Sequence, residues 1–367
     1  MRITRTSAGN APPRSLASRL EIEGQRPRCV FAFASATSDL DALATELASF
    51  GAPVIACTTA GQIGPAGFEV GDVTAAAVFD GLDVQTFLIP SLANLGSSVA
   101  TMAAEVNACG VLQTPDVEIF GVLLVDGLAG AEERLMAELH AALPQLLVVG
   151  GSAGDDLKFA RTLVFHDGKF ISGAAVLHIF TTRHRVTALK VQHHVPTEHR
   201  MVITSATPSK RTVHEMNGVP AVEAYAAAIG VPVDHLTDAV IAQHPLILRI
   251  GNEHYIRSVR AVRADGSLEL FCAIEPGLVL RLGTSTGILS TLEAAFSQAT
   301  EEVGTCELAL GFDCILRRLE IQRENLTEPV GKFFASQKVI GFSTFGEQCN
   351  ALHANQTFTG FMIGSPR

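Results

Sequence analysis

One serine in a glycine-rich run has the surroundings of a catalytic nucleophile. Residues 150–154 read G-G-S-A-G, which satisfies G-x-S-x-G, and Ser152 follows an apolar run that predicts a strand. A nucleophile elbow needs a helix after the serine, whereas Asp155, Asp156 and a predicted hairpin follow here. A tight turn or a close backbone approach explains the glycines equally well. A serine hydrolase acting through Ser152 is therefore only a lesser alternative.

Histidine is the other residue type that could do chemistry. The chain has 12 histidines, and His193 and His194 are adjacent, so that on a strand they would point to opposite faces. The sequence after His214 does not complete His-Glu-x-x-His, and no other spacing predicts a zinc site. A single neutral imidazole can still ligate a haem iron. The candidates are His193, His194, His244 and His353, each of which would also fit an ordinary hydrogen-bonded position.

Composition excludes several classes of protein. The net charge of −10 argues against a nucleic-acid partner, because phosphate binding needs a clustered basic face. The seven cysteines are odd in number and form no Cys-x-x-Cys, which favours free thiols in a reducing cytoplasm. The chain is 47% hydrophobic, yet no apolar run approaches the roughly 18 residues that span a bilayer. We therefore expect a cytoplasmic protein without a membrane span, whose residues 1–27 form a flexible basic tail.

Alternating apolar patterns predict a mixed α/β (α+β) fold. Helices are predicted at 39–50, 95–109, 131–143, 221–229, 288–303 and 316–326, and strands at 28–36, 53–57, 72–79, 84–89, 117–125, 146–149, 162–165, 170–180, 308–312, 339–345 and 357–363, with a further hairpin over 256–271. A glycine-rich loop is expected at 58–71. A polar stretch near 208–218 divides the chain into two domains, 28–210 and 218–365, in which helices flank mixed sheets.

Two separated motifs resemble those of a known family. From Lys338 the chain reads KVIGFSTFGEQCNALHANQTFTGFMIG, with a Gly-Glu pair at Gly346 and Glu347 and an Asn-x-Thr at Asn355 to Thr357. The run LLVVGGSAGDDLK, residues 146–158, resembles the glycine-rich signature of the N-terminal half of the same family. Together they resemble FIST sensory domains over roughly residues 28–364. The histidine pair and the run GFDCILRRLE at 311–320 look like the NosP-like branch of nitric-oxide-sensing haem proteins.

The resemblance implies a sensor rather than an enzyme. Haem b would be held without a covalent bond by one of the four candidate histidines, and nitric oxide would bind at its iron. The output would pass in trans to a histidine kinase or a cyclic-di-GMP enzyme, and a homodimer is left open. A second reading, proposed for FIST domains at large, is an amino-acid sensor without haem. In that reading the ligand-binding groups are Asp155, Arg317, Glu347 and Asn355.

Overall fold

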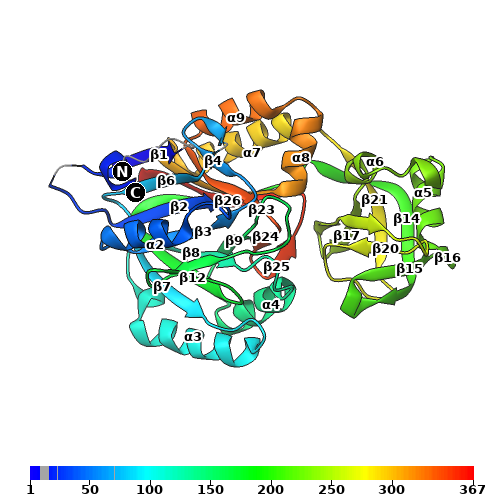
Figure 1. Cartoon of the computed structure of the whole chain (residues 1–367), viewed down its shortest axis with the longest axis horizontal. Coiled ribbons are helices and arrows are strands. Elements are labelled where there is room, and N and C mark those ends of the chain that lie inside the picture. Colours follow the sequence, from blue (N-terminus) through cyan, green and yellow to red (C-terminus); the bar gives the residue numbers. More distant parts are fainter. Residues whose placement is uncertain (9–15, 23, 70) are drawn as a thin grey trace.

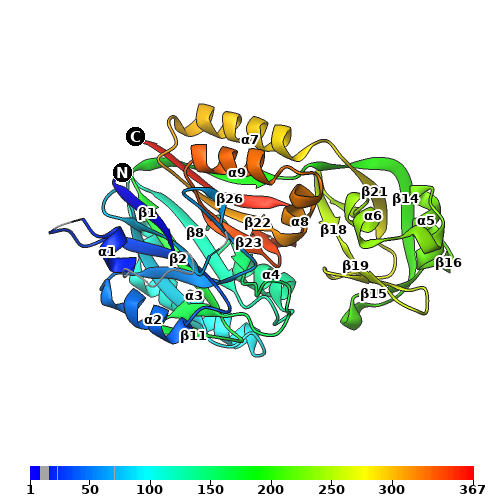
Figure 2. The same ribbon diagram turned by 45° about the horizontal axis from the view of Figure 1, so that its top comes forward.

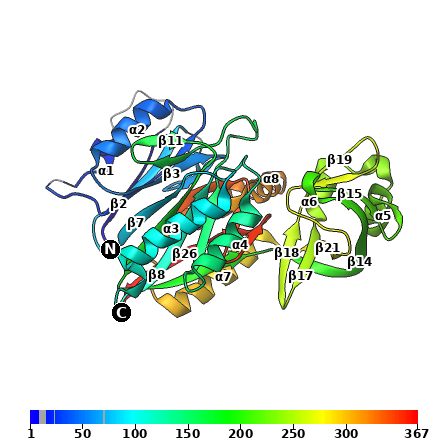
Figure 3. The same ribbon diagram turned by 90° about the horizontal axis from the view of Figure 1, so that it is seen from below.

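A computed structural model describes residues 1–8, 16–22, 24–69 and 71–367. The chain forms a large lobe and a small lobe, which lie end to end (Figure 1). The small lobe contains residues 194–285, and the large lobe contains the segments before and after it. Seen from the other two directions, the small lobe again lies next to α8 (Ile315–Arg323) at one end of the large lobe (Figure 2 and Figure 3).

Three six-stranded sheets build the large lobe. In spatial order, the first sheet contains β1 (Ile3–Ala8), β6 (Val73–Val78), β2 (Cys29–Ser35), β3 (Val54–Thr59), β10 (Val164–His166) and β11 (Lys169–Ile171). The second contains β25 (Leu352–Ala354), β24 (Glu347–Cys349), β9 (Val148–Ser152), β8 (Glu118–Val125), β12 (Ala175–Thr182) and β7 (Asp83–Ile89). The third contains β13 (His184–Val191), β26 (Phe358–Pro366), β22 (Leu308–Cys314), β23 (Val339–Thr344), β4 (Gln62–Gly64) and β5 (Gly67–Glu69).

Each of these sheets contains one pair of parallel strands joined by helix. The pairs are β2 with β3, β8 with β9, and β22 with β23. The connections carry α2 (Leu40–Ser49), α4 (Glu132–Ala142), and α8 with α9 (Thr327–Ser336). Parallel strands need such crossovers because the end of one strand and the start of the next lie at opposite ends of the sheet. The crossovers also fix where the carboxyl ends of the strands lie, and those ends build the site described below.

Phenylalanine side chains from all three sheets fill a shared core. Phe120 of the second sheet has its ring centroid 5.1 Å from that of Phe180 and 4.5 Å from that of Phe361 of the third sheet. Phe33 of the first sheet lies 4.8 Å from Phe342 of the third. Offset and tilted ring pairs at these distances stabilise a core beyond the area they bury. Much of the aromatic content is therefore used in packing the sheets together.

Helices cover the outer faces of the three sheets. α1 (Leu16–Leu20) and α2 pack on the first, α3 (Leu95–Cys109) and α4 on the second, and α7 (Ile288–Val303) and α9 on the third. α2 shows why these segments become helices, because the Asp39 side chain caps the backbone N–H of Ala42 and Leu40, Leu43 and Leu47 form one buried face. The layers of helix and sheet thus follow from amphipathic patterns in the sequence.

The small lobe is an antiparallel sheet with two helices. Its strands run in the order β18 (Glu253–Arg257), β17 (Leu246–Ile250), β21 (Val279–Ser285), β14 (His194–Thr207), β15 (Thr212–Met216), β20 (Leu268–Leu270) and β19 (Val259–Val262), with β16 (Val219–Pro220) paired to β15. Its helices are α5 (Ala221–Ile229) and α6 (Asp238–Gln243). The chain enters and leaves this lobe through neighbouring segments, since His194 pairs with Ser285.

The mixed α+β fold predicted from the sequence is confirmed. Among the described residues, no helix has both the length and the apolar character needed to cross a membrane. Three segments differ from expectation. The strand predicted at 170–180 is divided between β11 and β12, which belong to different sheets. The predicted loop at 58–71 contains β4 and β5, and the predicted N-terminal tail contains β1 and α1, where β1 pairs with β6 at the edge of the first sheet. Residues 9–15 and 23 of that tail lie outside the described residues.

Candidate functional site

The carboxyl ends of the three parallel strand pairs meet at the end of the large lobe that faces the small lobe. Two cavities there are lined by Thr37 after β2, Ala60 after β3, Gly127 after β8, Leu157 after β9, Ile315 after β22 and Phe345 after β23. Ligands of α/β proteins bind in crevices outside the carboxyl ends of parallel strands. The topology alone therefore makes this end of the lobe the candidate site.

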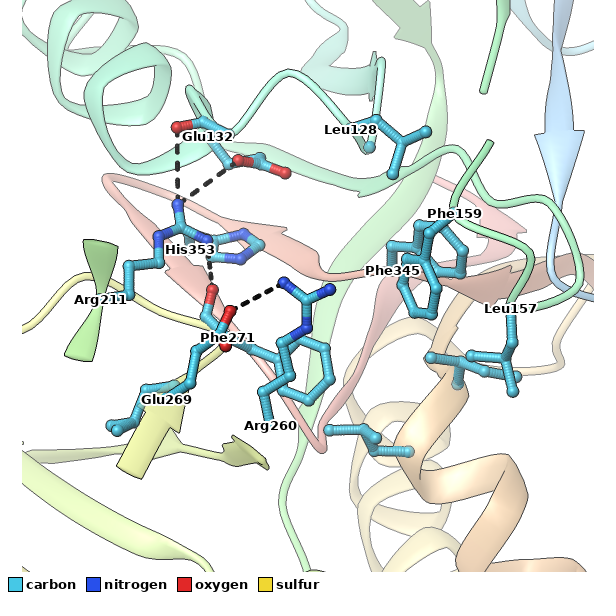
Figure 4. Close-up of a pocket in the computed structure, with 15 residues that line it drawn as sticks. Leu128, Glu132, Leu157, Phe159, Arg211, Arg260, Glu269, Phe271, Phe345 and His353 are labelled. Atoms are coloured by element: carbon cyan, nitrogen blue, oxygen red, sulfur yellow. Dashed lines mark hydrogen bonds and ion pairs between the residues drawn. The ribbon is translucent and has the colours of Figure 1, made fainter. Parts of the chain in front are cut away.

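We call the cavity between the two lobes the interlobe cavity, and its volume is about 380 Å³. Its apolar wall includes Leu128, Leu157, Phe159, Phe271, Ile315, Leu316 and Phe345, and its polar groups are Glu132, Arg211, Arg260, Glu269 and His353 (Figure 4). An adjoining cavity of about 290 Å³ shares Leu157, Phe159, Arg260, Phe271 and Leu316 with it. Volumes of this order, with apolar walls and a few polar groups, are typical of small-molecule sites.

Oppositely charged side chains from the two lobes form ion pairs beside this cavity. Arg211 of the small lobe lies 2.9 Å from Glu133 and 3.9 Å from Glu132 of α4, and it donates to the carbonyl of Phe271. Burial raises the pKa of Glu132 to about 7, and the neighbouring Glu133 carboxylate is the second cause of this increase. Arg260 pairs with Glu269 at 3.0 Å, and both belong to the small lobe. The cavity therefore offers both a guanidinium and a carboxyl group to a bound molecule.

His353 is the only one of the four predicted histidines that lines the interlobe cavity. It is 4% exposed, and its Nδ1 has no hydrogen-bond partner within the described part of the chain. Burial lowers the pKa of His353 to about 4, against the raising effect of Glu133. A hydrogen bond with the backbone of Glu347 also raises that pKa. The imidazole is therefore neutral near pH 7, with a lone pair available at Nδ1.

One short loop after β9 forms the apolar lip of the cavity. Leu157 and Phe159 are 38% and 42% exposed, and both have positive φ angles, 63° and 51°. The Asp155 carboxylate holds this conformation by accepting backbone N–H groups from Phe159, Ala160 and Arg161 at 2.9, 2.6 and 2.8 Å. The Phe159 ring stacks on Phe345 at 4.9 Å. Asp155 thus shapes the cavity wall without lining the cavity.

The other three residues predicted to bind a ligand have partners inside the protein. Arg317 pairs with Asp313 at 2.7 Å, and its side chain is fully buried. Glu347 accepts hydrogen bonds from Thr344 and from Thr357, and Asn355 accepts one from the Cys272 thiol. These side chains lie behind the cavity wall, so a direct ligand contact for them stays a prediction.

The remaining predicted histidines lie away from the interlobe cavity. His193 has both ring nitrogens bonded, Nδ1 to Arg317 at 2.8 Å and Nε2 to Glu320 at 3.0 Å. His194 is 1% exposed, and neither of its ring nitrogens has a hydrogen-bond partner among the residues that the structure describes. Burial lowers the pKa of His194 to about 3. His244 is half-buried directly after α6, and burial also lowers its pKa.

Ser152 lies at the end of β9 and is completely buried. Its hydroxyl accepts a hydrogen bond from the Gln348 side chain at 2.9 Å. The next element is the hydrogen-bonded loop of Asp155 rather than a helix, which is the arrangement that the sequence argument expected.

Sequence reasoning missed most of the polar groups of the cavity. Glu132 stands in the predicted helix at 131–143, and Arg260 and Glu269 stand in the predicted hairpin at 256–271. Arg211 stands in the polar stretch near 208–218, and none of the four belongs to a motif. The nearest signal was the glutamate pair at the start of α4, which an exposed helix N-terminus would also explain.

A cavity at parallel strand ends between two lobes is the arrangement typical of small-molecule sites. Comparison with protein families gives the particular class. The FIST N domain matches residues 28–219, and the FIST C domain matches residues 221–350. The chain therefore belongs to the FIST family, whose members are small-ligand sensory domains of signalling proteins. A search of curated proteins found no match.

Proposed function

We propose that this protein is a sensor whose small ligand binds in the interlobe cavity. One observation carries the proposal: a cavity of about 380 Å³ between the lobes, lined from both of them, at the carboxyl ends of the parallel strands. A ligand that contacts both lobes binds best at one lobe separation, so it shifts the population toward that arrangement. Such a shift is a signal that another protein can read.

Haem b is the first proposed ligand, with His353 as the residue that would hold its iron. The fit rests on the free, buried Nδ1 of a neutral imidazole beside an apolar wall. Arg260 offers a guanidinium that a propionate could bind. The iron would supply a site for nitric oxide. His193 fits less well, because both of its ring nitrogens already have partners.

An amino acid is the second proposed ligand, favoured by the charges of the same cavity. A guanidinium and a carboxylate, Arg260 and Glu269, lie beside apolar side chains, and an α-amino acid carries the complementary groups. In both readings the output would act in trans, in a cytoplasmic setting, on a histidine kinase or a cyclic-di-GMP enzyme.

A spectral titration of the purified protein with haem, followed by nitric oxide, tests the first ligand. We expect a saturable haem band in the wild type and in His244→Ala, and its loss in His353→Ala. Saturable binding that survives in His353→Ala, or a spectrum that nitric oxide leaves unchanged, would reject this reading. Thermal stabilisation by amino acids but not by haem, abolished in Arg260→Ala, would favour the second ligand. Failure of both would remove the cavity as the sensory site.

A further inference from the structure

Three side chains that could ligate a metal ion meet where the two lobes touch. Glu133 comes from α4 and His353 from β25 of the large lobe, while Cys272 follows β20 in the small lobe. One ligand atom from each lies within 4.8 Å of the other two. Cys272 and His353 are buried and Glu133 is half-buried. The group thus combines a thiol, an imidazole and a carboxylate from three distant parts of the chain.

We propose that these three residues bind a divalent transition-metal ion of the zinc type, which links the small lobe to the large lobe. Sulfur, nitrogen and oxygen ligands of this kind are the set that zinc prefers. Three protein ligands leave a fourth tetrahedral position for water or for a ligand. Bond lengths of about 2.0–2.3 Å place tetrahedral ligand atoms about 3.5 Å apart, so the three atoms would approach one another by up to about 1.3 Å.

The surroundings of His353 supply the independent observation. Its Nδ1 is buried without a hydrogen-bond partner among the described residues. In the neutral tautomer that is protonated at Nε2, this nitrogen carries a free lone pair that a metal ion can bind. The Nε2–H is then the group that metal-ligating histidines characteristically donate to a second acceptor. A buried acceptor with no donor is otherwise costly to keep.

The groups around Glu133 and Cys272 also suit ligation. Glu133 Oε1 accepts the backbone N–H of Ala273 at 2.8 Å and Oε2 accepts from Arg211 at 2.9 Å, and each oxygen keeps a second lone pair. These bonds would orient the carboxylate, as outer-shell partners do. On metal binding the Cys272 thiol loses its proton to solvent. The Asn355 amide, which now accepts from that thiol, can rotate and donate to the thiolate instead.

The second buried group of potential ligands in the described chain is less suitable. His193, His194 and Glu320 also lie within 4.8 Å of one another. Arg317 donates to His193 Nδ1, so His193 Nε2 carries the proton that points to Glu320. A metal at Nε2 would have to displace that proton beside a guanidinium. His353 has no such obstacle.

Metal binding by these three residues requires no ligand in the interlobe cavity. A haem iron at His353 Nδ1 and this ion would exclude each other, so the ion belongs to the haem-free protein. Its presence would fix the lobe separation when the cavity is empty.

The test is a Co²⁺ titration of the haem-free, chelator-treated full-length protein. We expect one Co²⁺ per chain with a thiolate-to-cobalt charge-transfer band, displaced by Zn²⁺. Cys272→Ser should abolish the band, and Glu133→Gln should weaken binding by at least about tenfold. Cys109→Ser, which changes an exposed cysteine at the end of α3, is the matched control and should leave binding unchanged.

Thermal unfolding gives a second readout. Zn²⁺ should raise the Tm of the wild type and of Cys109→Ser but not that of Cys272→Ser, whose own Tm without metal shows that it is folded. The proposal is overturned if no charge-transfer band forms, or if Cys272→Ser binds Co²⁺ as the wild type does. The test of the proposed function can be distinguished from this one, because haem binding should require His353 but not Cys272.

Discussion

The Glu347 carboxyl makes the stability of the large lobe depend on pH in a way that can be calculated. Burial raises its pKa from 4.5 to about 8, although hydrogen bonds from Thr344 and Thr357 lower it. The folded protein therefore holds this proton at pH 7, whereas the unfolded chain releases it near pH 4.5. Between these two pKa values the folded state binds more protons than the unfolded chain. The contribution of Glu347 to the free energy of unfolding is therefore fully present below pH 4.5 and is lost as the pH rises toward 8.

The magnitude follows from the two pKa values. A single group contributes at most about 1.4 kcal/mol per pH unit, so between pH 5.5 and 7.5 the loss is about 2–3 kcal/mol. Glu347→Gln removes the titration and keeps the shape. Its amide oxygen can accept from Thr357 and its amide nitrogen can donate to the Thr344 hydroxyl. The variant should therefore lack this part of the pH dependence.

The assay is urea unfolding of the wild type and Glu347→Gln at several pH values from 5.5 to 7.5. Both tyrosines, Tyr225 and Tyr255, belong to the small lobe and there is no tryptophan, so far-UV circular dichroism is the probe that includes the large lobe. We expect the difference in unfolding free energy between the proteins to change by about 2–3 kcal/mol across this range. Glu301→Gln, on the exposed face of α7, should run parallel to the wild type. Parallel curves for Glu347→Gln would show that Glu347 is ionised in the folded state and refute the reasoning.

Three further substitutions test the groups around the cavity. Asp155→Ala removes the acceptor of three backbone N–H groups and should lower the free energy of unfolding by about 3 kcal/mol, with a smaller loss for Asp155→Asn in the same urea titration. Arg317→Met leaves the buried Asp313 without its cation and should cost about 3–5 kcal/mol, and adding Asp313→Asn should restore part of this loss; no restoration would argue against the pair. In Gly346→Ala the new Cβ would lie 2.1 Å from His353 Cε1, so the ring must move, and an unchanged His353 imidazole signal by NMR would contradict the packing.

Local patterns were sufficient to predict several helices of this fold. The predicted ranges of α3, α5 and α7 match the structure residue for residue, because amphipathic spacing ends at a glycine in each case. Gly110 and Gly230 adopt the left-handed conformation that a helix C-cap favours. By contrast β4 and β5 have only three residues each and follow no local pattern, because β4 depends on pairing with β23 and β5 on pairing with β4.

The site was much less predictable, since the apposition of two lobes creates it. Glu132 and Glu269 are far apart in sequence and face the same cavity only because residues 194–285 fold as a separate lobe. His353 could be predicted as a candidate because a single neutral imidazole can ligate a haem iron. Glu347 drew attention because it stands in the Gly-Glu pair that resembles the family pattern, and in the structure it is fully buried and bonded to two threonines.

α8 connects the cavity with the point where the chain enters the small lobe. Its first residues, Ile315 and Leu316, line the interlobe cavity, and the next one, Arg317, bonds to His193. The His193 carbonyl in turn accepts the backbone N–H of Thr286 at 2.7 Å, which ties the incoming and outgoing segments together. A ligand that packs against the start of α8 therefore acts on an element bonded directly to this junction. We expect Arg317→Met to weaken the coupling between ligand binding and lobe position, measurable by small-angle scattering with and without ligand, while the cavity itself keeps its lining. An unchanged scattering response would mean that the lobes respond to the ligand only through the residues that they each present to it.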